Sequence, residues 1–230
     1  TPKSYREAME SKFAKYWRAA CEKEIRNLEE HKVHTWVHAP PGAHLIRGTW
    51  AWKVKADDKG AISAWKARLV SQGFRQLYGV DYVDTMAPVG KLTTFRLLIA
   101  EAARRGVLYR FLDIRSAYLN ADIDIKQYMK PPPGVTAPSP GMVMRLDKCL
   151  YGLRQSTRGW HQKFRRELLE WGFRASEADP CLFVKMRGHS VCRVLLFVDD
   201  MAIFHDNDKD GKALIDELVS HIDERYKFSA

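Results

Sequence analysis

Apolar residues recur at helical spacing in four parts of the chain. Residues 5–31 are predicted to form one or two amphipathic helices that pack through their apolar face. The same spacing predicts a helix over residues 93–105, which ends at Gly106. Two later helices carry one apolar stripe each, formed by Trp160, Phe164, Leu168 and Trp171 before Gly172, and by Leu214, Leu218 and Ile222.

Between residues 49 and 70 the pattern changes to an alternation of apolar and polar residues. This alternation predicts a β-hairpin around a turn at residues 57–60. Pairing the arms around that turn places Trp52 opposite Trp65, and a slip of one residue would mix the two faces. One face then carries Trp50, Trp52, Val54, Trp65, Ala67 and Leu69, and the other carries Lys53, Lys55, Lys66 and Arg68.

The row of cations on this hairpin has two interpretations. A row of charges is most often a solvated outer face. The alternative is a finger that binds the phosphates of a nucleotide or nucleic acid.

Further strands are predicted in the second half of the chain. Residues 107–114 are predicted to form a strand with Asp113 at its end. A short helix over residues 117–119 follows. Residues 181–185 pair with residues 191–198 across a turn. With the helices, these strands predict an α+β fold, in which an antiparallel sheet carries helices on one face. A single acid at a strand end, such as Asp113, is more often a helix cap than a ligand.

Two adjacent acids, Asp199 and Asp200, interrupt the most apolar stretch of the chain. Residues 194–198 and 201–204 flank them, so the pattern predicts a buried hairpin with both carboxylates at its tip. Tight hairpin turns favour Asn-Gly or Asp-Gly, which Asp-Asp replaces poorly. Two like charges a few Å apart in a partly desolvated place repel by on the order of a few kcal/mol. A proton or a divalent metal ion between them would remove that repulsion.

Composition narrows the class of protein. The chain has 230 residues and a formal net charge of +10, which favours one domain, with or without a subdomain, and a polyanionic partner. No apolar run is long enough for a membrane span, so no membrane partner is expected. Four scattered cysteines without a C-x-x-C pair are typical of reduced core residues, and we expect an intracellular protein.

Three acids at strand ends are what two-metal phosphoryl transfer requires. One ion activates the attacking 3′ hydroxyl, and the other holds the triphosphate. Mg²⁺ suits this chemistry because it accepts one or two carboxylates and completes its shell with water and phosphate oxygens. With the basic hairpin upstream, Asp113, Asp199 and Asp200 predict a polymerase that uses Mg²⁺, with Mn²⁺ as a possible substitute.

Five segments in order resemble the reverse transcriptase domain of copia-type LTR retrotransposon polyproteins. They are KARLVSQGF (66–74), DYVDTMAPV (81–89), LDIRSAYLN (112–120), LYGLRQ (150–155) with Trp160, and FVDD (197–200). The resemblance implies a fingers-and-palm polymerase that copies RNA or DNA into DNA. It implies a helical segment over residues 1–35, mainly fingers over residues 36–106 and mainly palm over residues 107–230.

The resemblance also implies roles for single residues. It matches Asp113, Asp199 and Asp200 to the catalytic, metal-binding aspartates. It matches Tyr118 to the aromatic side chain that excludes a ribose 2′ hydroxyl, although an ordinary buried aromatic is the alternative. It matches Gln155 to a side chain that lies against the incoming nucleotide. Lys66 and Arg68 are then candidates to bind the triphosphate, and Lys53 and Lys55 to bind nucleic acid.

Some residues depart from the family pattern. Phe197 replaces the usual tyrosine, which removes a hydroxyl and keeps the ring. Ser156 and Thr157 stand where Ala-Pro is usual, so we expect a less fixed loop after Gln155. The thumb is expected to be absent from this chain.

The expected partners are an RNA template, a DNA primer or RNA–DNA hybrid, and deoxynucleoside triphosphates. In an intact polyprotein, the resemblance implies integrase upstream and RNase H downstream, and a cytoplasmic particle or the nucleus as location. A second functional class stays open, in which the chain is a catalytically inactive or domesticated remnant that binds nucleic acid through its basic fingers.

Two other possible metal sites are not supported. His31, His34 and His38 lack a cysteine or acid that would complete a tetrahedral zinc site. The acids between residues 206 and 210 do not follow the spacing of an EF-hand, and helix capping accounts for them.

Overall fold

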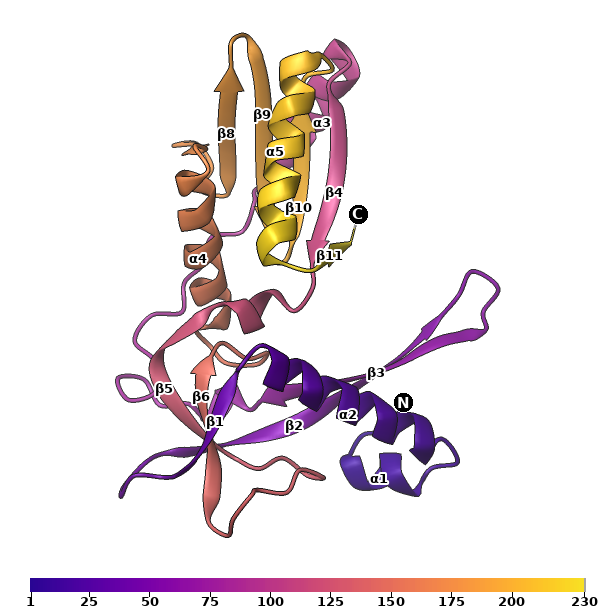
Figure 1. The fold of residues 1–230 in the computed structure, drawn as a ribbon, viewed down its shortest axis with the longest axis vertical. Coiled ribbons are helices and arrows are strands. Elements are labelled where there is room, and N and C mark those ends of the chain that lie inside the picture. The colour runs from indigo at the N-terminus through magenta and orange to yellow at the C-terminus, as the bar shows by residue number, and fades with distance from the viewer. Residues whose placement is uncertain (230) are drawn as a thin grey trace. The chain divides into compact units, whose positions relative to one another are not determined.

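The computed structural model describes residues 1–229, which form two compact units (Figure 1). The first unit consists of residues 1–85 and 118–159, and the second of residues 86–117 and from 160 onward. These boundaries differ from the predicted division at residues 35 and 106, because residues 118–159 add strands to the N-terminal sheet. No helix among the described residues is long and apolar enough to cross a membrane.

The first unit combines two helices with a five-stranded mixed sheet. Its strand order is β1-β6-β5-β2-β3, and only the pair β2 and β5 is parallel. The short helix η1 (Gly73–Arg75) follows β3. The longer elements are α1 (Tyr5–Glu10), α2 (Ala14–Glu30), β1 (His34–His38), β2 (Leu45–Ala56), β3 (Ile62–Ser71), β5 (Asp122–Lys130) and β6 (Met142–Lys148).

An aromatic cluster joins α2 to the hairpin of β2 and β3. The ring centroid of Trp17 lies 4.5 Å from that of Trp65 and 5.3 Å from that of Trp52. Trp17 is 2% exposed, so one face of α2 is buried against the apolar face of the hairpin. The predicted amphipathic N-terminal helices are therefore confirmed, and helix packing holds the hairpin by its tryptophans.

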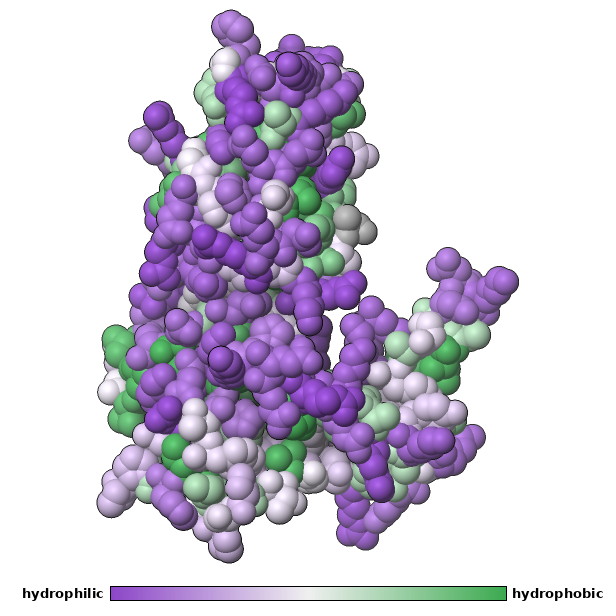
Figure 2. Space-filling view, in the orientation of Figure 1, coloured by the Kyte–Doolittle hydropathy of each residue, from purple (hydrophilic) through white to green (hydrophobic). Residues whose placement is uncertain are grey.

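The register of this hairpin differs from the prediction by two residues. Trp52 pairs with Ala67 and Lys53 pairs with Lys66. One residue of the difference arises at the turn, where Ala56 pairs with Ile62, and the other arises at a bulge between Lys55 and Ala56. A shift of two residues leaves every side chain on its predicted face. The apolar and cationic faces are consequently as expected, although the predicted partners were wrong. Hydrophilic side chains dominate the visible tip of the hairpin (Figure 2).

The second unit contains a six-stranded antiparallel sheet in the order β11-β4-β10-β9-β8-β7. The short helix η2 (Ala117–Asn120) follows β4 as predicted, and all its residues except Ala117 belong to the first unit. The helix α4 (Ser156–Glu170) begins in the first unit and has most of its length in the second. The other elements are α3 (Leu92–Arg105), β4 (Leu108–Ile114), β7 (Arg174–Ala175), β8 (Leu182–Arg187), β9 (Ser190–Phe197), β10 (Asp200–His205), α5 (Lys209–Arg225) and β11 (Phe228–Ser229).

Helices lie on both faces of this sheet, and the predicted placement on one face was wrong. Arg193 of β9 binds Glu101 of α3 at 3.1 Å. Lys185, the cross-strand partner of Cys192, binds Glu217 of α5 at 3.1 Å. Because adjacent strand residues point to opposite faces, α3 and α5 cover opposite sides. The α+β class itself is confirmed.

Three strands of the first unit, β1, β5 and β6, were not predicted. β5 carries the fully buried Gln127 where an apolar residue would continue the alternation. β1 is only five residues long and contains His34 and His38. These polar residues weaken the alternation of apolar and polar positions from which strands are predicted.

The four cysteines are free and buried, as expected for core residues. Burial raises the pKa of the Cys21, Cys149 and Cys192 thiols to about 12. Burial also raises the pKa of Cys181 to about 11.

Candidate functional site

The three predicted acids meet at one end of the sheet in the second unit. Asp113 of β4 and Asp200 of β10 are direct cross-strand partners, so their side chains share one face of the sheet. Asp199 precedes Asp200, and its backbone carbonyl accepts a hydrogen bond from Ile114 N–H at 3.1 Å. Like charges directly opposite each other destabilise a sheet. The fold therefore maintains an arrangement that is unfavourable without a counter-charge.

The turn before Asp200 is strained. Phe197 pairs with Asp200, so Val198 and Asp199 are the turn residues, and the prediction that placed both acids in the turn is corrected by one residue. Val198 has a φ of 59°, a conformation that a β-branched residue adopts rarely and at a cost of about 1–3 kcal/mol. The indole N–H of the buried Trp160 donates to the Val198 carbonyl at 2.7 Å. This hydrogen bond fixes the strained turn.

The electrostatics of the acids favour bound positive charge. The pKa of Asp200 is raised by partial burial and then by the negative charges of Asp199 and Asp113. The hydroxyl of Ser229 donates to the Asp113 carboxylate at 3.4 Å. A proton or a cation would relieve the repulsion at Asp200.

The donors of this cluster suit a hard cation. Among residues 1–229, no three His, Cys, Asp or Glu side chains converge closely enough to hold a metal ion by themselves. Mg²⁺ commonly takes one or two carboxylates and fills its other positions with water and substrate phosphates. The oxygen-only pair of Asp113 and Asp200, which are cross-strand partners on one sheet face, fits that requirement.

The cationic face of the hairpin lies in the first unit. Lys53, Lys55, Lys66 and Arg68 are all exposed there. Lys53 is the direct partner of Lys66, which is another pair of like charges in register. Behind this face, the Glu24 carboxylate accepts the backbone N–H of Leu69 at 3.2 Å. Burial raises the pKa of Glu24, and Arg68 and Lys66 counteract this effect.

Tyr118 is a half-buried residue of η2. Its hydroxyl lies 3.1 Å from Thr157 Oγ1, and its ring centroid lies 5.0 Å from that of Tyr151. One edge of the ring is thus held by a hydrogen bond and one side by an aromatic contact.

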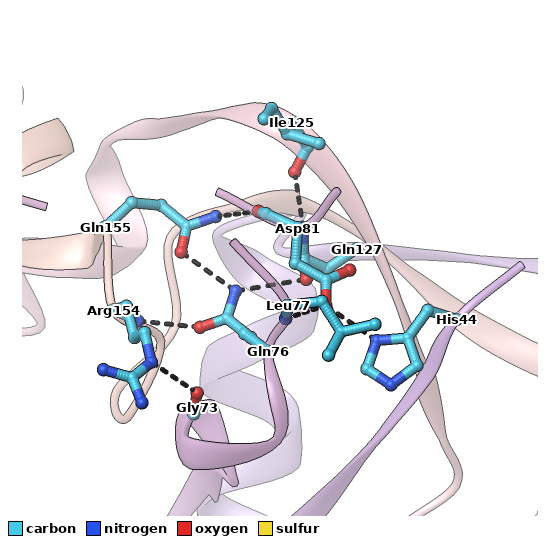
Figure 3. A network of polar contacts seen from close by, with 9 residues as sticks. All are labelled: His44, Gly73, Gln76, Leu77, Asp81, Ile125, Gln127, Arg154 and Gln155. Carbon is cyan, nitrogen blue, oxygen red and sulfur yellow. Dashed lines mark hydrogen bonds and ion pairs between the residues drawn. The ribbon is translucent and has the colours of Figure 1, made fainter. Parts of the chain in front are cut away.

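Gln155 lies in a buried amide network that Figure 3 shows from close by. It is 2% exposed, its Nε2 donates to the Asp81 carbonyl at 3.0 Å, and its Oε1 accepts from Gln76 Nε2 at 3.0 Å. Gln127 joins through Gln76 at 3.1 Å and through the Asp81 carbonyl at 2.7 Å. The predicted direct contact of Gln155 with a nucleotide conflicts with this burial, because both ends of its amide are already bonded inside the unit.

The loop after residue 149 is fixed by side-chain hydrogen bonds. The Ser156 hydroxyl donates to the Leu150 carbonyl at 2.7 Å, and Gln76 Oε1 accepts the backbone N–H of Arg154 at 2.9 Å. The expectation of a looser loop at Ser156 and Thr157 was therefore wrong. Their hydroxyls supply hydrogen bonds that fix the chain at this point.

The first unit also has an open cavity of about 550 Å³ that contains none of the predicted site residues. Its walls combine Trp36 and Trp50 with Arg18, Arg26 and Glu22.

A model of the family described as "Reverse transcriptase (RNA-dependent DNA polymerase)" matches residues 31–229. The chain belongs to the reverse transcriptase family. This result agrees with the resemblance found in the five sequence segments, all of which lie in the matched range.

Relatives of this reverse transcriptase domain are Pol polyproteins of copia and Ty1-type retrotransposons. This chain is 37% identical to the Pol polyproteins from transposons RE2 and RE1 of Arabidopsis thaliana. The aligned 191 residues are 81% of this chain. It is 31% identical over 204 residues, or 88% of this chain, to that from transposon TNT 1-94 of Nicotiana tabacum. The chain spans only 13% and 15% of the length of these relatives.

Similarity also extends to a yeast polyprotein, over a shorter stretch, and to a solved structure. The Transposon Ty1-MR1 Gag-Pol polyprotein of Saccharomyces cerevisiae is 38% identical over 116 residues, which is 49% of this chain and 6% of the relative. The crystal structure of prototype foamy virus protease-reverse transcriptase aligns with 92% of this chain and 23% of that chain, at 12% identity and a TM-score of 0.49.

Sequence reasoning missed three contributors to the candidate site of the reverse transcriptase domain. Trp160 was assigned to the core and to the family resemblance but not to the site, and its bond to the turn has no signal in the periodicity. Gln76 was not singled out, although it joins Gln155 to Gln127. Gly90 donates its N–H to the Leu196 carbonyl at 3.1 Å, and a Cβ there would lie 2.7 Å from that oxygen. Only a glycine permits this close approach beside the acidic hairpin.

Proposed function

We propose that the chain is a fingers-and-palm RNA-directed DNA polymerase domain that adds deoxynucleotides to the 3′ end of a primer. The pairing of Asp113 with Asp200 beside the strained turn at Asp199 is the observation that supports this proposal most. Membership of the reverse transcriptase family agrees with it.

Asp113, Asp199 and Asp200 are proposed as the catalytic residues that hold Mg²⁺, or Mn²⁺ in its place. When bound, such an ion stabilises phosphate charge and lowers the pKa of the attacking hydroxyl. The contribution of the chain is to hold Asp113 and Asp200 opposite each other on one sheet face, with Asp199 in the adjoining turn. Trp160 maintains the turn that presents Asp199.

The first unit is proposed to supply the contacts to the nucleotide. Lys66 and Arg68 bind the triphosphate, and Tyr118 crowds the position of a ribose 2′ hydroxyl. Gln155 acts as a positioning residue through its buried amide network, because its side chain is not accessible. Lys53 and Lys55 bind the backbone of an RNA template or a DNA primer.

Primer extension tests the proposal directly. We expect the chain to extend oligo-dT on poly-rA with Mg²⁺, and EDTA to stop extension. Asp199→Asn, Asp200→Asn and Asp113→Asn should each reduce extension by at least about a hundredfold, since each removes a charge that holds the ion. Asp216→Asn, on the exposed side of α5, is the matched control and should extend like the wild type. Undiminished extension by Asp199→Asn would refute the catalytic assignment.

One observation favours a second candidate function, binding of nucleic acid without catalysis. The exposed cationic face on which Lys53 pairs with Lys66 is a surface that the phosphates of a nucleic acid can bind. A chain that binds the primer–template but does not extend it under any divalent ion would support this alternative.

Other expectations stay predictions. They are the intracellular location, in a cytoplasmic particle or the nucleus, and the integrase and RNase H neighbours within a longer polyprotein.

A further inference from the structure

Four side chains from separate segments of the first unit form one continuous chain of contacts. The Arg68 guanidinium carbon lies 4.8 Å from the ring centroid of Tyr151, and that centroid lies 5.0 Å from the ring centroid of Tyr118. The Tyr118 hydroxyl then lies 3.1 Å from Thr157 Oγ1. The proposed function gives roles only to the two members Arg68 and Tyr118.

Tyr151 is itself held against the strand that carries Arg68. Its carbonyl accepts the backbone N–H of Ser71, the last residue of β3, at 2.7 Å. The following Gly152 has a φ of +87°, and a Cβ there would lie 2.2 Å from the Ser71 carbonyl oxygen. Only glycine fits both conditions, so the backbone beside Tyr151 is clamped to β3.

The contacts of Tyr151 restrict two flexible groups at once. A guanidinium over an aromatic face is attracted by the ring quadrupole, which limits the positions that the Arg68 head group samples. The tilted contact of 59° with Tyr118 restricts the movement of that ring. Tyr151 therefore connects the proposed triphosphate-binding side chain to the proposed sugar-selecting side chain.

Thr157 determines the remaining freedom of Tyr118. A tyrosine ring that packs on only one side still moves in and out of its site. The hydrogen bond between the two hydroxyls fixes the far edge of the ring to the first turn of α4. The depth of the Tyr118 ring is then set by Tyr151 on one side and by Thr157 at its hydroxyl.

We propose that Tyr151 and Thr157 are positioning residues that set sugar selectivity and triphosphate binding through Tyr118 and Arg68. This inference rests on the proposed polymerase function and deepens it. In this proposal, Tyr151 influences both triphosphate binding and sugar selection, and Thr157 influences sugar selection only.

The first experiment measures discrimination between dTTP and UTP in single-nucleotide incorporation opposite poly-rA. Thr157→Val removes the hydroxyl with little change in volume, and Tyr118→Phe removes the other partner of the bond. Each should lower the ratio of kcat/KM for dTTP over UTP about fivefold, as expected for one hydrogen bond. The double variant should lose no more than either single variant, because both remove the same bond.

The second experiment separates the ring of Tyr151 from its hydroxyl. Tyr151→Leu removes both ring contacts and should raise KM for dTTP about fivefold and lower discrimination, with kcat within about twofold of the wild type. Tyr151→Phe keeps the ring and should restore both values. Tyr82→Leu is the matched control, because Arg154 lies over the Tyr82 ring at 5.4 Å in the same unit. It should leave KM and discrimination unchanged.

The outcomes distinguish this inference from the proposed function. If the wild type incorporates dTTP and folded Thr157→Val keeps full discrimination, the role of Thr157 is wrong while the polymerase assignment stands. Additive losses in the double variant would likewise refute the coupling. If Tyr82→Leu raises KM as much as Tyr151→Leu, the effect is general destabilisation and not positioning. A wild-type chain that incorporates neither nucleotide would overturn the proposed function, and the positioning roles with it.

Discussion

At the scale of single residues, the acidic turn depends on one indole hydrogen bond. Val198 is held at a φ of 59°, and its carbonyl has Trp160 Nε1 as a partner at 2.7 Å. Strain of this kind persists only where surrounding contacts over-determine the conformation. Trp160 is 1% exposed and stacks on Phe164, so it cannot move away from the turn easily.

Trp160→Phe should therefore disturb the turn more than the fold. Removing the indole N–H leaves the Val198 carbonyl unpaired at a cost of about 1–3 kcal/mol, and we expect kcat to fall at least about tenfold with little change in KM. Trp171→Phe is the matched control, because its buried indole nitrogen has no hydrogen-bond partner among the described residues. Urea unfolding and steady-state kinetics check both variants. Equal kinetic losses in the two would contradict a special role for the turn.

Side-chain partners were the least predictable feature at this scale. The residue types at Asp113, Asp199 and Asp200 indicated their role, because adjacent acids in an apolar stretch are costly. Nothing in the local pattern showed that Gln155 is buried by Gln76, which lies 79 positions earlier. Such pairing depends on tertiary contacts, and spacing along the chain does not encode it.

At the scale of elements, the β2–β3 hairpin separates packing from charge. Trp52 and Trp65 contact Trp17 of α2, and the cations lie on the other face of the hairpin. Changing the cations should therefore alter binding while the aromatic packing stays intact.

We expect Lys66→Ala and Arg68→Ala to raise KM for dTTP more than the Kd for primer–template. Lys53→Ala and Lys55→Ala should do the reverse, and each lost phosphate contact should reduce the salt dependence of binding by about 0.7–0.9 in log–log slope. Nucleotide titrations and filter binding at several salt concentrations measure the two effects. If all four variants lose both equally, the hairpin is a general phosphate surface.

The five-stranded sheet has an electrostatic contact of its own. Asp147 of β6 accepts bonds from Thr35 of β1 at 2.6 Å and Lys126 of β5 at 3.0 Å, beside Arg145 at 2.9 Å. Burial raises the pKa of Asp147, but these hydrogen bonds outweigh burial and lower it to about 2. The contact thus joins three strands of one sheet.

Because the pKa of Asp147 is lower in the folded state, its stabilisation is present above about pH 4 and is lost as the pH falls toward 2. Asp147→Asn should reduce the free energy of unfolding by on the order of 2 kcal/mol at pH 7 and by little at pH 2. Denaturant unfolding at a series of pH values tests this, and a difference independent of pH would contradict it.

Elements with a strong apolar period were predicted correctly, and those with polar interruptions were not. The helices α2, α3, α4 and α5 and the strands β4, β8 and β9 follow one consistent pattern each. β5 is paired in parallel with β2 through contacts more than 80 residues apart and has a buried glutamine, so no local signal identified it.

At the scale of the whole molecule, the two compact units carry different parts of the proposed chemistry. The acids belong to the second unit, and the cationic hairpin belongs to the first. A ligand of the acids should consequently stabilise one unit selectively.

Mg²⁺ should slow amide hydrogen exchange in β4 and β10 of the second unit and leave β2 and β3 of the first unit unchanged. An ion that binds only the folded state reduces the population of unfolded states from which the amides exchange. Asp200→Asn should abolish the effect. Without metal, the same variant should be more stable than the wild type at pH 7, because the raised pKa of Asp200 means that its ionised form opposes folding above that pKa. Uniform protection of both units by Mg²⁺ would contradict the assignment.

The burial of all four thiols has a practical consequence. With pKa values of about 11 to 12 and no exposed sulfur, the native cysteines should react very slowly with maleimides at neutral pH. A single cysteine introduced at the exposed Asp58, at the tip of the hairpin, would then carry a fluorophore without a cysteine-free background. The basic finger can be labelled and followed in solution in the otherwise unaltered chain.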